Sequence, residues 1–354
     1  MNSLSTGELI TKIRQGEIIE KVSLQNISLT RQDLSGGIFR EVNFSGADFS
    51  HAQLKETVFT ECQFEEAVFD SVLLEQSTFE QCNMIRTVFH KSEIINSVFN
   101  QCILQKARFT ENKQNETQFI SSSLRCAEFN NSDLERVTFI DSTLNQAKLT
   151  NNQLFLVTFF RLDLRETGFS ANEYTKTVFF ECDLRGQDYQ KQQFKECLFT
   201  DCQLEAANFN YARLTNCNFK GATLQGAMLS NVNATQALFI EADLTQACCS
   251  NSLFEQAIFV GACLESADFR QSKLIQAIMH KVHAVNAQFT GCDMSYADLS
   301  YANVNNSNFR TAHFMRTLFH RAQQTETLFS DRRGILENDP ELFAAEEWSM
   351  QRKI

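Results

Sequence analysis

Three side chains that can bind a metal recur at a fixed interval in the sequence. Asp243, Cys263 and His283 are spaced by 20 residues, and carboxylate, thiol and imidazole groups are all common metal ligands. They could lie about 5 Å apart if the chain returned to one surface every 20 residues. A chain built on such an interval brings potential ligands together by chance, so we predict no metal site and no cofactor.

Other catalytic signals are missing from the sequence as well. We find no Gly-rich phosphate loop, no recognisable Ser or Cys nucleophile motif and no Cys-x-x-Cys pair. Eight of the twelve cysteines share one position of a short repeat: Cys62, Cys82, Cys102, Cys182, Cys197, Cys202, Cys217 and Cys292. Cysteines confined to a packing position behave as small buried apolar residues, so we predict that the protein is not an enzyme.

The elements that position these residues follow a period of five. From Leu24 to Phe329 the positions ending in 4 or 9 are almost all apolar, and a small residue precedes each by two, as in Ala47-Asp48-Phe49. Of the 31 positions ending in 9, 24 are Phe, whereas the 31 ending in 4 hold 17 Leu. A period of five fits neither a helix nor a strand. It fits a coil that turns a corner every five residues, and the only proline, Pro340, lies beyond the last repeat.

This pattern resembles the pentapeptide-repeat family over about 310 of the 354 residues. The resemblance implies an all-β fold, a right-handed quadrilateral parallel β-helix with four pentapeptides in each coil. About 15 coils at a spacing of ~4.8 Å would form one elongated domain roughly 75 Å long. The Phe and Leu classes would then occupy alternate faces, and both would point into the core.

The two flanks are predicted to be helical. Residues 1–21 carry an N-cap candidate at Ser5 or Thr6 and a stop at Gly16, and Asp339-Pro340 opens a second helix within 331–354. We expect short helical caps on a solenoid of residues 22–330, because open coil ends expose unpaired backbone. The alternative for the C-terminal helix is homodimerisation, which the resemblance to topoisomerase-protecting family members implies.

Two polar stretches interrupt the apolar pattern. Asn112 and Gln114 replace a small and a large apolar residue, and Gln187 and Gln192 flank Tyr189. Because the register resumes after both, we expect a local bulge or bend there, and we keep a loop that meets a partner as the alternative.

The acidic charge is uneven. The net charge is −11, and residues 41–80 alone sum to −8. We call the following residues the acidic lobe: Glu41, Glu56, Glu61, Glu65, Glu66, Asp70, Glu75 and Glu80. Quinolone-resistance members of the family mimic DNA in gyrase, but duplex DNA carries one charge per ~1.7 Å, far more than this chain. A solvated acidic face is the alternative, and the negative charge argues against direct nucleic-acid binding.

One outward column is apolar. Residues just after the central position, 20 apart, include Ile120, Ile140, Phe160, Phe180, Ile240 and Val260, whereas the equivalent column on the opposite face, from Thr110 to Arg270, has no apolar residue. Phe155 and Leu156 add apolar area at the same coils. We predict that this column binds a protein partner, and shielding of the coil corners is the alternative.

These features predict a bacterial protein-binding solenoid that acts as a scaffold, adaptor or chaperone. No signal peptide or membrane span is recognisable, so we expect a cytoplasmic protein. The opening Gly7 to Glu17 resembles pentapeptide modules of secretion machinery, which implies type VI effector loading and a secretion component or effector as partner. A gyrase-directed DNA mimic and a secreted effector acting in a host cell are the alternatives.

Overall fold

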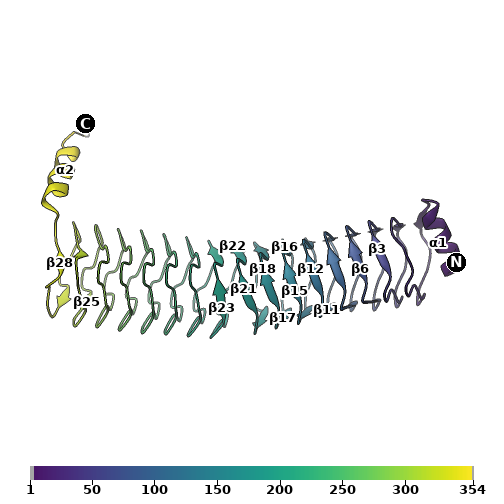
Figure 1. The fold of residues 1–354 in the computed structure, drawn as a ribbon, viewed down its shortest axis with the longest axis horizontal. Coiled ribbons are helices and arrows are strands. Elements are labelled where there is room, and N and C mark those ends of the chain that lie inside the picture. The colour runs from purple at the N-terminus through teal and green to yellow at the C-terminus, as the bar shows by residue number, and fades with distance from the viewer. Residues whose placement is uncertain (1–3, 353–354) are drawn as a thin grey trace. The chain divides into compact units, whose positions relative to one another are not determined.

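The computed structural model describes residues 4–352 and divides into two compact units, residues 4–183 and 184–352. Each unit is a parallel β-solenoid in which residue i pairs with residue i + 20, so four pentapeptides form one coil (Figure 1). The predicted all-β solenoid is therefore confirmed. Each coil turns its corners at positions ending in 1 or 6, where φ lies near +55°, as in Glu61 and Glu66.

Helix α1 (Thr6–Arg14) opens the N-terminal unit as the sequence predicts. Ser5 is the N-cap and exchanges hydrogen bonds with Glu8, and the helix ends before Gly16, whose φ is +74°. Leu9 and Ile13 are buried, and Thr6 donates to the carbonyl of Ser28 in the adjoining coil. The helix therefore covers apolar surface at this end of the unit.

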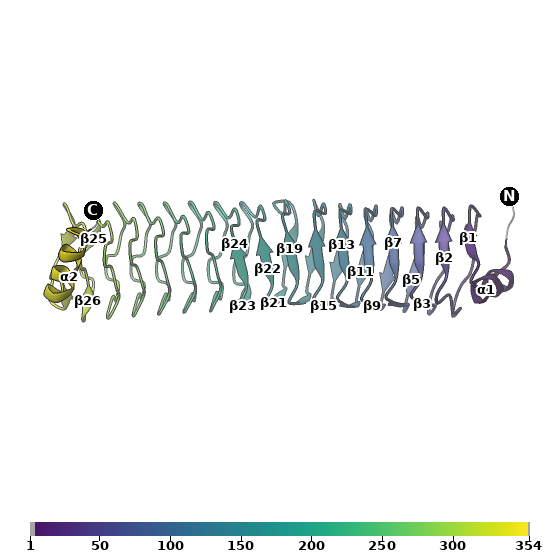
Figure 2. The ribbon, with the colours of Figure 1, turned by 90° about the horizontal axis from the view of Figure 1, so that it is seen from above.

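Three faces of the N-terminal unit are sheets of three-residue strands. Figure 2 looks onto the first, formed by β1 (Ile18–Glu20), β2 (Ile38–Arg40), β4 (Val58–Thr60), β7 (Thr78–Glu80), β10 (Val98–Asn100), β13 (Gln118–Ile120), β16 (Thr138–Ile140), β19 (Thr158–Phe160) and β22 (Val178–Phe180). The opposite face holds β5 (Val68–Asp70), β8 (Val88–His90), β11 (Arg108–Thr110), β14 (Glu128–Asn130), β17 (Lys148–Thr150) and β20 (Gly168–Ser170).

The remaining two faces of this unit differ in pairing. One holds β3 (Gln53–Lys55), β6 (Leu73–Glu75), β9 (Glu93–Ile95), β12 (Lys113–Asn115), β15 (Asp133–Glu135), β18 (Gln153–Phe155) and β21 (Glu173–Thr175). The other is joined by isolated parallel bridges, such as Asn43 to Gln63.

The C-terminal unit contains few strands. They are β23 (Gln193–Lys195), β24 (Leu198–Thr200), β25 (Asn308–Phe309), β26 (Thr317–Leu318), β27 (Leu328–Phe329) and β28 (Ile335–Leu336). Between residues 200 and 308 the coils are joined by isolated bridges in the same register, such as Asp243 to Cys263. The last pairing, of β26 with β28, extends the solenoid a few residues into the segment predicted as the C-terminal flank.

The core of both units is a set of side-chain ladders. The rings of Phe99, Phe119 and Phe139 stack at 5.0 and 5.1 Å in one unit, and those of Phe219 and Phe239 stack at 5.0 Å in the other. The eight cysteines assigned to the small position are all buried, as predicted, and none of them forms a disulfide bond within residues 4–352. Burial raises the pKa of the Cys292 thiol to about 12, so this thiol is held in its neutral form.

Of the bulge or bend expected at the polar stretches, the bulge does not occur. Strand β12, which contains Gln114, pairs in register with β9 and β15, and Asp188 pairs with Asn208 beyond Gln187. Asn112 fits the small position because its amide donates to the carbonyl of Phe89 and accepts from the backbone N–H of Ser92. A buried amide with both bonds made replaces a small side chain without displacing the backbone.

Helix α2 (Pro340–Met350) begins at the predicted N-cap Asp339 and has no buried residue. It projects sideways from the last coil of the C-terminal unit (Figure 1). Polar contacts hold it there: Glu346 interacts with Tyr301, His320 and Arg321, and the Arg321 guanidinium lies 4.1 Å from the centre of the Phe343 ring. Trp348 stays 59% exposed. Residues 331–338, which include β28, also contact the last coil: the carbonyls of Gly334 and Leu336 accept the N–H groups of Thr317 and Phe319, and the Asn338 side chain accepts the N–H of Arg321.

Candidate protein-binding face

The predicted apolar column lies on the first sheet of the N-terminal unit. Ile120 pairs with Ile140, Ile140 with Phe160, and Phe160 with Phe180, at the ends of β13, β16, β19 and β22. All four side chains point away from the core and are half-buried, while the preceding Phe of each strand is completely buried. The sequence therefore assigned the orientation of these residues correctly.

Phe160 and Phe180 are the largest side chains of this column. Their rings stack with centroids 5.5 Å apart and planes within 5°, and the Arg161 guanidinium lies 4.8 Å from the Phe160 ring centre. Arg161 also pairs with Glu181 at 2.7 Å. The two rings therefore form a preorganised flat surface with a charged border, which suits contact with another protein.

The structure does not bring Phe155 and Leu156 onto this face. Phe155 ends β18 on the neighbouring face and is 39% exposed. Leu156 follows at the corner between the two faces, where φ is +56°. These residues extend the apolar surface around a corner, and they do not enlarge the flat column.

The equivalent face of the C-terminal unit has two apolar rows. Ile240 and Val260 form the predicted row and are half-buried. Leu238, Ile258 and Ile278 form a second row, are joined by consecutive bridges, and Ile278 is 40% exposed. Sequence reasoning missed the second row because it followed only the residue after each central position. The residues before the central position, from 238 to 278, carried the missing signal.

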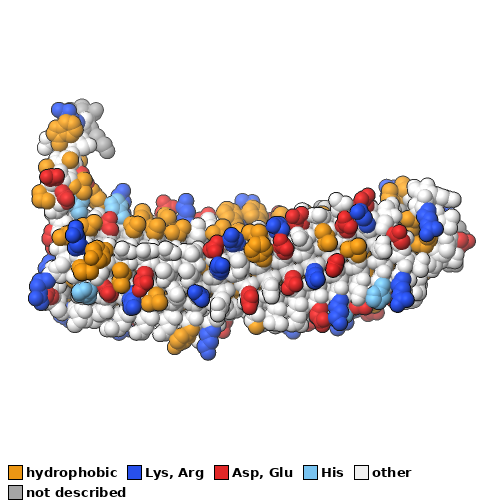
Figure 3. All heavy atoms as spheres, in the orientation of Figure 1, with side chains coloured by type: hydrophobic (Ala, Val, Ile, Leu, Met, Phe, Trp, Pro, Cys, Tyr) orange, Lys and Arg blue, Asp and Glu red, His pale blue; other side chains and the backbone are white. Residues whose placement is uncertain are grey.

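On the opposite faces the row after the central position is polar in both units, although Met228, before a central position, is 38% exposed. In the N-terminal unit Ser170 donates to the Thr150 hydroxyl at 3.2 Å, and in the C-terminal unit the Ser230 and Ser250 hydroxyls lie 3.1 Å apart. The outward rows of one solenoid therefore differ in chemistry at matched positions. Figure 3 shows hydrophobic side chains along the upper edge of each unit, which is the edge formed by the apolar face.

The acidic lobe is spread around the N-terminal coils. Glu41 and Glu61 lie at one corner, Glu66 and Glu56 at two others, and Glu65, Asp70, Glu75 and Glu80 on four different faces. Four of the eight carboxylates make ion pairs: Glu41 with Lys21, Glu75 with Lys55, and Glu65 and Glu66 with Arg86. These residues surround the coils and do not form one acidic strip.

The spaced ligand candidates do lie next to one another in the C-terminal unit. Asp243 pairs with Cys263 and Cys263 with His283 along one column of bridges. Asp243 accepts hydrogen bonds from Thr245 and Gln225, the Cys263 sulfur lies 3.2 Å from the Thr245 hydroxyl, and His283 lies 4.0 Å from Glu265. Within residues 4–352 no group of three or more His, Cys, Asp or Glu side chains converges in a way that could hold a metal ion.

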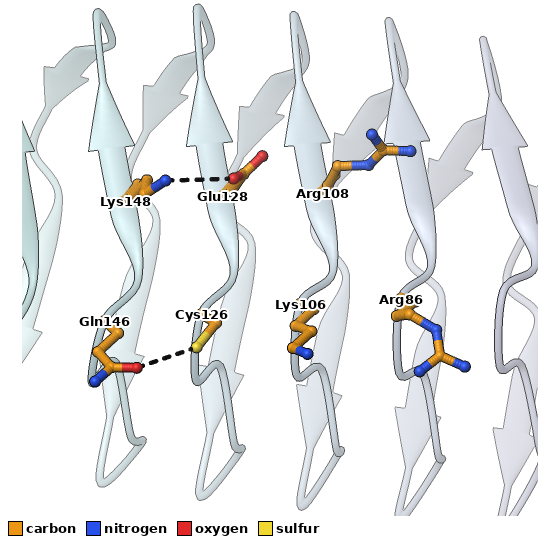
Figure 4. Close-up of a pocket in the computed structure, with 7 residues that line it drawn as sticks. All are labelled: Arg86, Lys106, Arg108, Cys126, Glu128, Gln146 and Lys148. Atoms are coloured by element: carbon orange, nitrogen blue, oxygen red, sulfur yellow. Dashed lines mark hydrogen bonds and ion pairs between the residues drawn. The ribbon is translucent and has the colours of Figure 1, made fainter.

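A shallow groove with a volume of about 580 Å³ crosses the N-terminal unit. It lies at the corner between the bridged face and the face of β11, β14 and β17. We call it the basic groove, and Figure 4 shows its lining residues: Arg86, Lys106, Arg108, Cys126, Glu128, Gln146 and Lys148. They come from the corner positions and the first strand positions of successive coils. The sequence analysis missed this groove because its Lys and Arg residues are dispersed in the sequence. They become neighbours only because each coil has 20 residues.

Comparisons with known proteins agree with this architecture. The family model for the pentapeptide repeat region matches residues 32–109 and 172–248. The model for eight copies of the pentapeptide repeat matches residues 115–151, 237–276, 275–310 and 292–331. Neither model describes a catalytic domain. No curated protein matches the sequence. Over residues 4–352 no helix combines the length and the apolar character needed to cross a membrane.

Several solved structures are similar to this chain. One is HetL of the cyanobacterium Nostoc, a pentapeptide repeat protein involved in heterocyst differentiation regulation, at 18% identity over 76% of this chain and 97% of HetL, with a TM-score of 0.20. Another is a trypsin-treated form of QnrB1, a plasmid-mediated fluoroquinolone resistance protein, at 18% identity over 51% of this chain and 89% of that form, with a TM-score of 0.29. The repeat models and the 20-residue coils together show that the chain belongs to the pentapeptide-repeat family.

Proposed function

We propose that this protein is a non-enzymatic solenoid that binds another protein through its apolar face. The observation that carries this proposal is the contrast between matched outward positions: Ile140, Phe160 and Phe180 on one face, and Thr150 and Ser170 on the other. Soluble proteins seldom expose contiguous apolar surface without a partner for it. Stacked aromatic rings on a rigid sheet also lose little conformational freedom on binding.

A matched pair of double variants tests this proposal. Phe160→Asp with Phe180→Asp should keep the solenoid folded, because neither ring enters the core, and should weaken binding of the native partner by roughly tenfold or more. Thr150→Asp with Ser170→Asp adds the same charge to the same coils on the opposite face. Affinity capture from the native cell, followed by titration of the captured protein, compares the two. Equal capture by wild type and both variants would contradict the proposal.

Within this role we propose a scaffold, adaptor or chaperone that loads effectors in a type VI secretion system, in the cytoplasm. The support is the resemblance of residues 7–17 to modules of such machinery. The partner captured by the wild type should then be a secretion component or an effector. Deleting the gene should reduce effector release without changing effector synthesis.

A gyrase-directed role is the second candidate, and it is supported by the negative charge of residues 41–80. It requires an acidic surface that competes with DNA, so Glu61→Lys, Glu65→Lys and Glu66→Lys together should remove any effect on supercoiling or fluoroquinolone inhibition. If wild-type protein leaves gyrase and topoisomerase IV unchanged, this candidate is excluded. A role as a secreted effector inside a host cell would instead appear as transfer of the protein into that cell.

A further inference from the structure

The basic groove carries positive charge that the surrounding structure leaves uncompensated. Four cations and one carboxylate line it. Arg86 is engaged by Glu65 and Glu66, and Lys148 lies 3.8 Å from Glu128. Across residues 4–352, Lys106 and Arg108 make no ion pair, although Glu128 lies on the next coil beside Arg108. Two unpaired cations therefore face one groove in a chain of net charge −11.

The groove is short along the coil axis. Arg86, Lys106, Cys126 and Gln146 occupy the same corner of four successive coils, which span three coil spacings or roughly 14 Å. Acidic residues, Glu66 and Glu166, occupy this corner on the coils just beyond each end. A long polyanion such as a nucleic acid would have to pass these carboxylates, and like charges repel it there. A short anion would meet only the basic stretch.

The shape of the groove favours a peptide over a compact metabolite. Small-molecule sites enclose most of the ligand, whereas this groove is open along the surface. Side chains on one side of an extended peptide recur every ~6.6 Å, so roughly two or three acidic side chains fit within 14 Å. Charge-assisted hydrogen bonds from Lys106 and Arg108 to carboxylates are the strong interactions available here.

We propose that the basic groove binds a short acidic segment of polypeptide in extended conformation. This site is separate from the apolar face, because it lies at the corner between the bridged face and the face of β11, β14 and β17. Its occupation therefore does not depend on the proposed function. Loss of one site and retention of the other can be distinguished in the same full-length protein.

Titration with a fluorescein-labelled hexaglutamate peptide tests the proposal. Its fluorescence anisotropy should rise with full-length protein, the affinity should fall as salt is added, and a hexaglutamine peptide should not bind. Lys106→Glu with Arg108→Glu should weaken hexaglutamate binding by roughly tenfold or more. Lys113→Glu with Lys220→Glu changes the net charge equally at exposed positions elsewhere and should leave the affinity within about twofold.

Cys126 supplies a second readout inside the groove. Its sulfur lies 3.5 Å from the Gln146 side-chain oxygen (Figure 4) and is partly accessible, whereas Cys248 is exposed elsewhere. Bound hexaglutamate should slow alkylation of Cys126 and leave Cys248 unchanged, as measured by mass spectrometry. The proposal is overturned if hexaglutamine binds equally, if the Lys106 and Arg108 double variant keeps wild-type affinity, or if hexaglutamate leaves Cys126 unprotected. It is also overturned if a short DNA duplex binds more tightly and protects Cys126, since the groove would then select nucleic acid.

Discussion

The two units differ in which donor most often bonds the buried carbonyl of the central residue, besides the pairing between coils. In much of the N-terminal unit the small position holds Ser, Thr, Cys or Asn, and its side chain donates to a carbonyl of the previous coil, as Ser122 does to Phe99 at 3.0 Å. In the C-terminal unit this position is mostly Ala. There the carbonyl of the central residue accepts the N–H three residues later, as Leu244 does from Ala247 at 2.9 Å. Both patterns give the buried carbonyl of a central residue a hydrogen-bond donor from a small position.

Neither pattern is confined to one unit, and the two can occur at one carbonyl, since Leu144 accepts both the N–H of Ala147 at 2.9 Å and the hydroxyl of Thr167 at 3.0 Å. Ala127 in the N-terminal unit makes the same turn to Leu124, and Ser252 in the C-terminal unit donates to the carbonyl of Leu229 at 2.8 Å. A hydroxyl can replace a backbone donor, whereas a methyl group cannot. The comparison therefore shows that one coil geometry is compatible with two hydrogen-bond patterns, which occur separately or together.

A second difference accompanies the isolated bridges at some of the C-terminal coils. Asp or Asn often precedes the central residue there, and its side chain accepts the N–H two residues later, as Asp243 does from Thr245 and Asp298 from Ser300. Such Asx turns use a donor that would otherwise extend the ladder to the neighbouring coil. Pairing then remains at one residue on each face, in an unchanged register.

The largest expected effect concerns what the two units share. Phe119→Ala and Phe239→Ala each remove one ring from a stack with neighbours on both sides at 4.9 to 5.1 Å. Each should lower the free energy of unfolding by about 3–5 kcal/mol, because a cavity replaces a completely buried ring. Chemical denaturation measures both. A much smaller loss for Phe239→Ala would mean that the C-terminal coils relax around the cavity and the N-terminal coils do not.

The sequence predicted this shared core because one period of five fixes which residues point inward in every coil. The sequence could not predict the hydrogen-bond pattern. A Ser or Asp side chain can bond to a neighbouring coil or to its own turn, and the choice depends on distances between coils. The same limit applies to the sites. The orientation of Phe160 and Phe180 followed from the period, but the second apolar row at Leu238 and the basic groove arise from neighbours 20 residues apart.

Gln114 is a defect in the ladder of the N-terminal unit. It is 1% exposed among apolar side chains, and neither atom of its amide has a hydrogen-bond partner within the described residues. Gln114→Leu restores the residue type of its neighbour Leu134 and should raise the free energy of unfolding by about 1–3 kcal/mol. Leu274→Gln, at the equivalent position of the C-terminal unit, should lower it by a similar amount. A lower free energy of unfolding for Gln114→Leu would contradict this expectation, because the Gln114 amide would then stabilise the folded protein.

Ser122 tests the side-chain donor pattern directly. Its hydroxyl donates to the carbonyl of Phe99 and accepts the N–H of Cys102 at 3.0 Å. Ser122→Ala should cost about 1–2 kcal/mol, because these buried groups lose a partner. Ser122→Cys is the control, because Cys102 occupies the same position one coil earlier and its thiol donates to a carbonyl in the same way. If Ser122→Ala melts at the same temperature as Ser122→Cys or higher, the backbone of the alanine variant has adopted the turn of the C-terminal coils.

Alkaline pH should act on the buried thiols of the C-terminal unit. Burial holds the pKa of Cys292 at about 12, above its ordinary value of 9.0, so the unfolded chain releases this proton first. The contribution of this neutral thiol to the free energy of unfolding is fully present below about pH 9. It is lost between about pH 9 and 12, at up to about 1.4 kcal/mol per pH unit. Other groups titrate in this range, so the measurement is the difference between wild type and Cys292→Ala. Parallel stability curves for the two proteins above pH 9 would contradict the expectation.

The smallest effects are expected at the surface ion pairs, where the two units should behave alike. Arg161 pairs with Glu181 at 2.7 Å in one unit and Arg270 with Asp268 at 2.7 Å in the other, and both arginines are largely exposed. Arg161→Gln and Arg270→Gln should each change the free energy of unfolding by about 0–1 kcal/mol, because solvent screens exposed charges and the paired side chains lose rotamer freedom. The change should shrink further in high salt. Arg161 has one property that Arg270 lacks, since it borders the Phe160 ring on the apolar face. If Arg161→Gln leaves stability unchanged but weakens partner binding, the arginine serves the interface, and a stability loss of several kcal/mol would instead assign it to the fold.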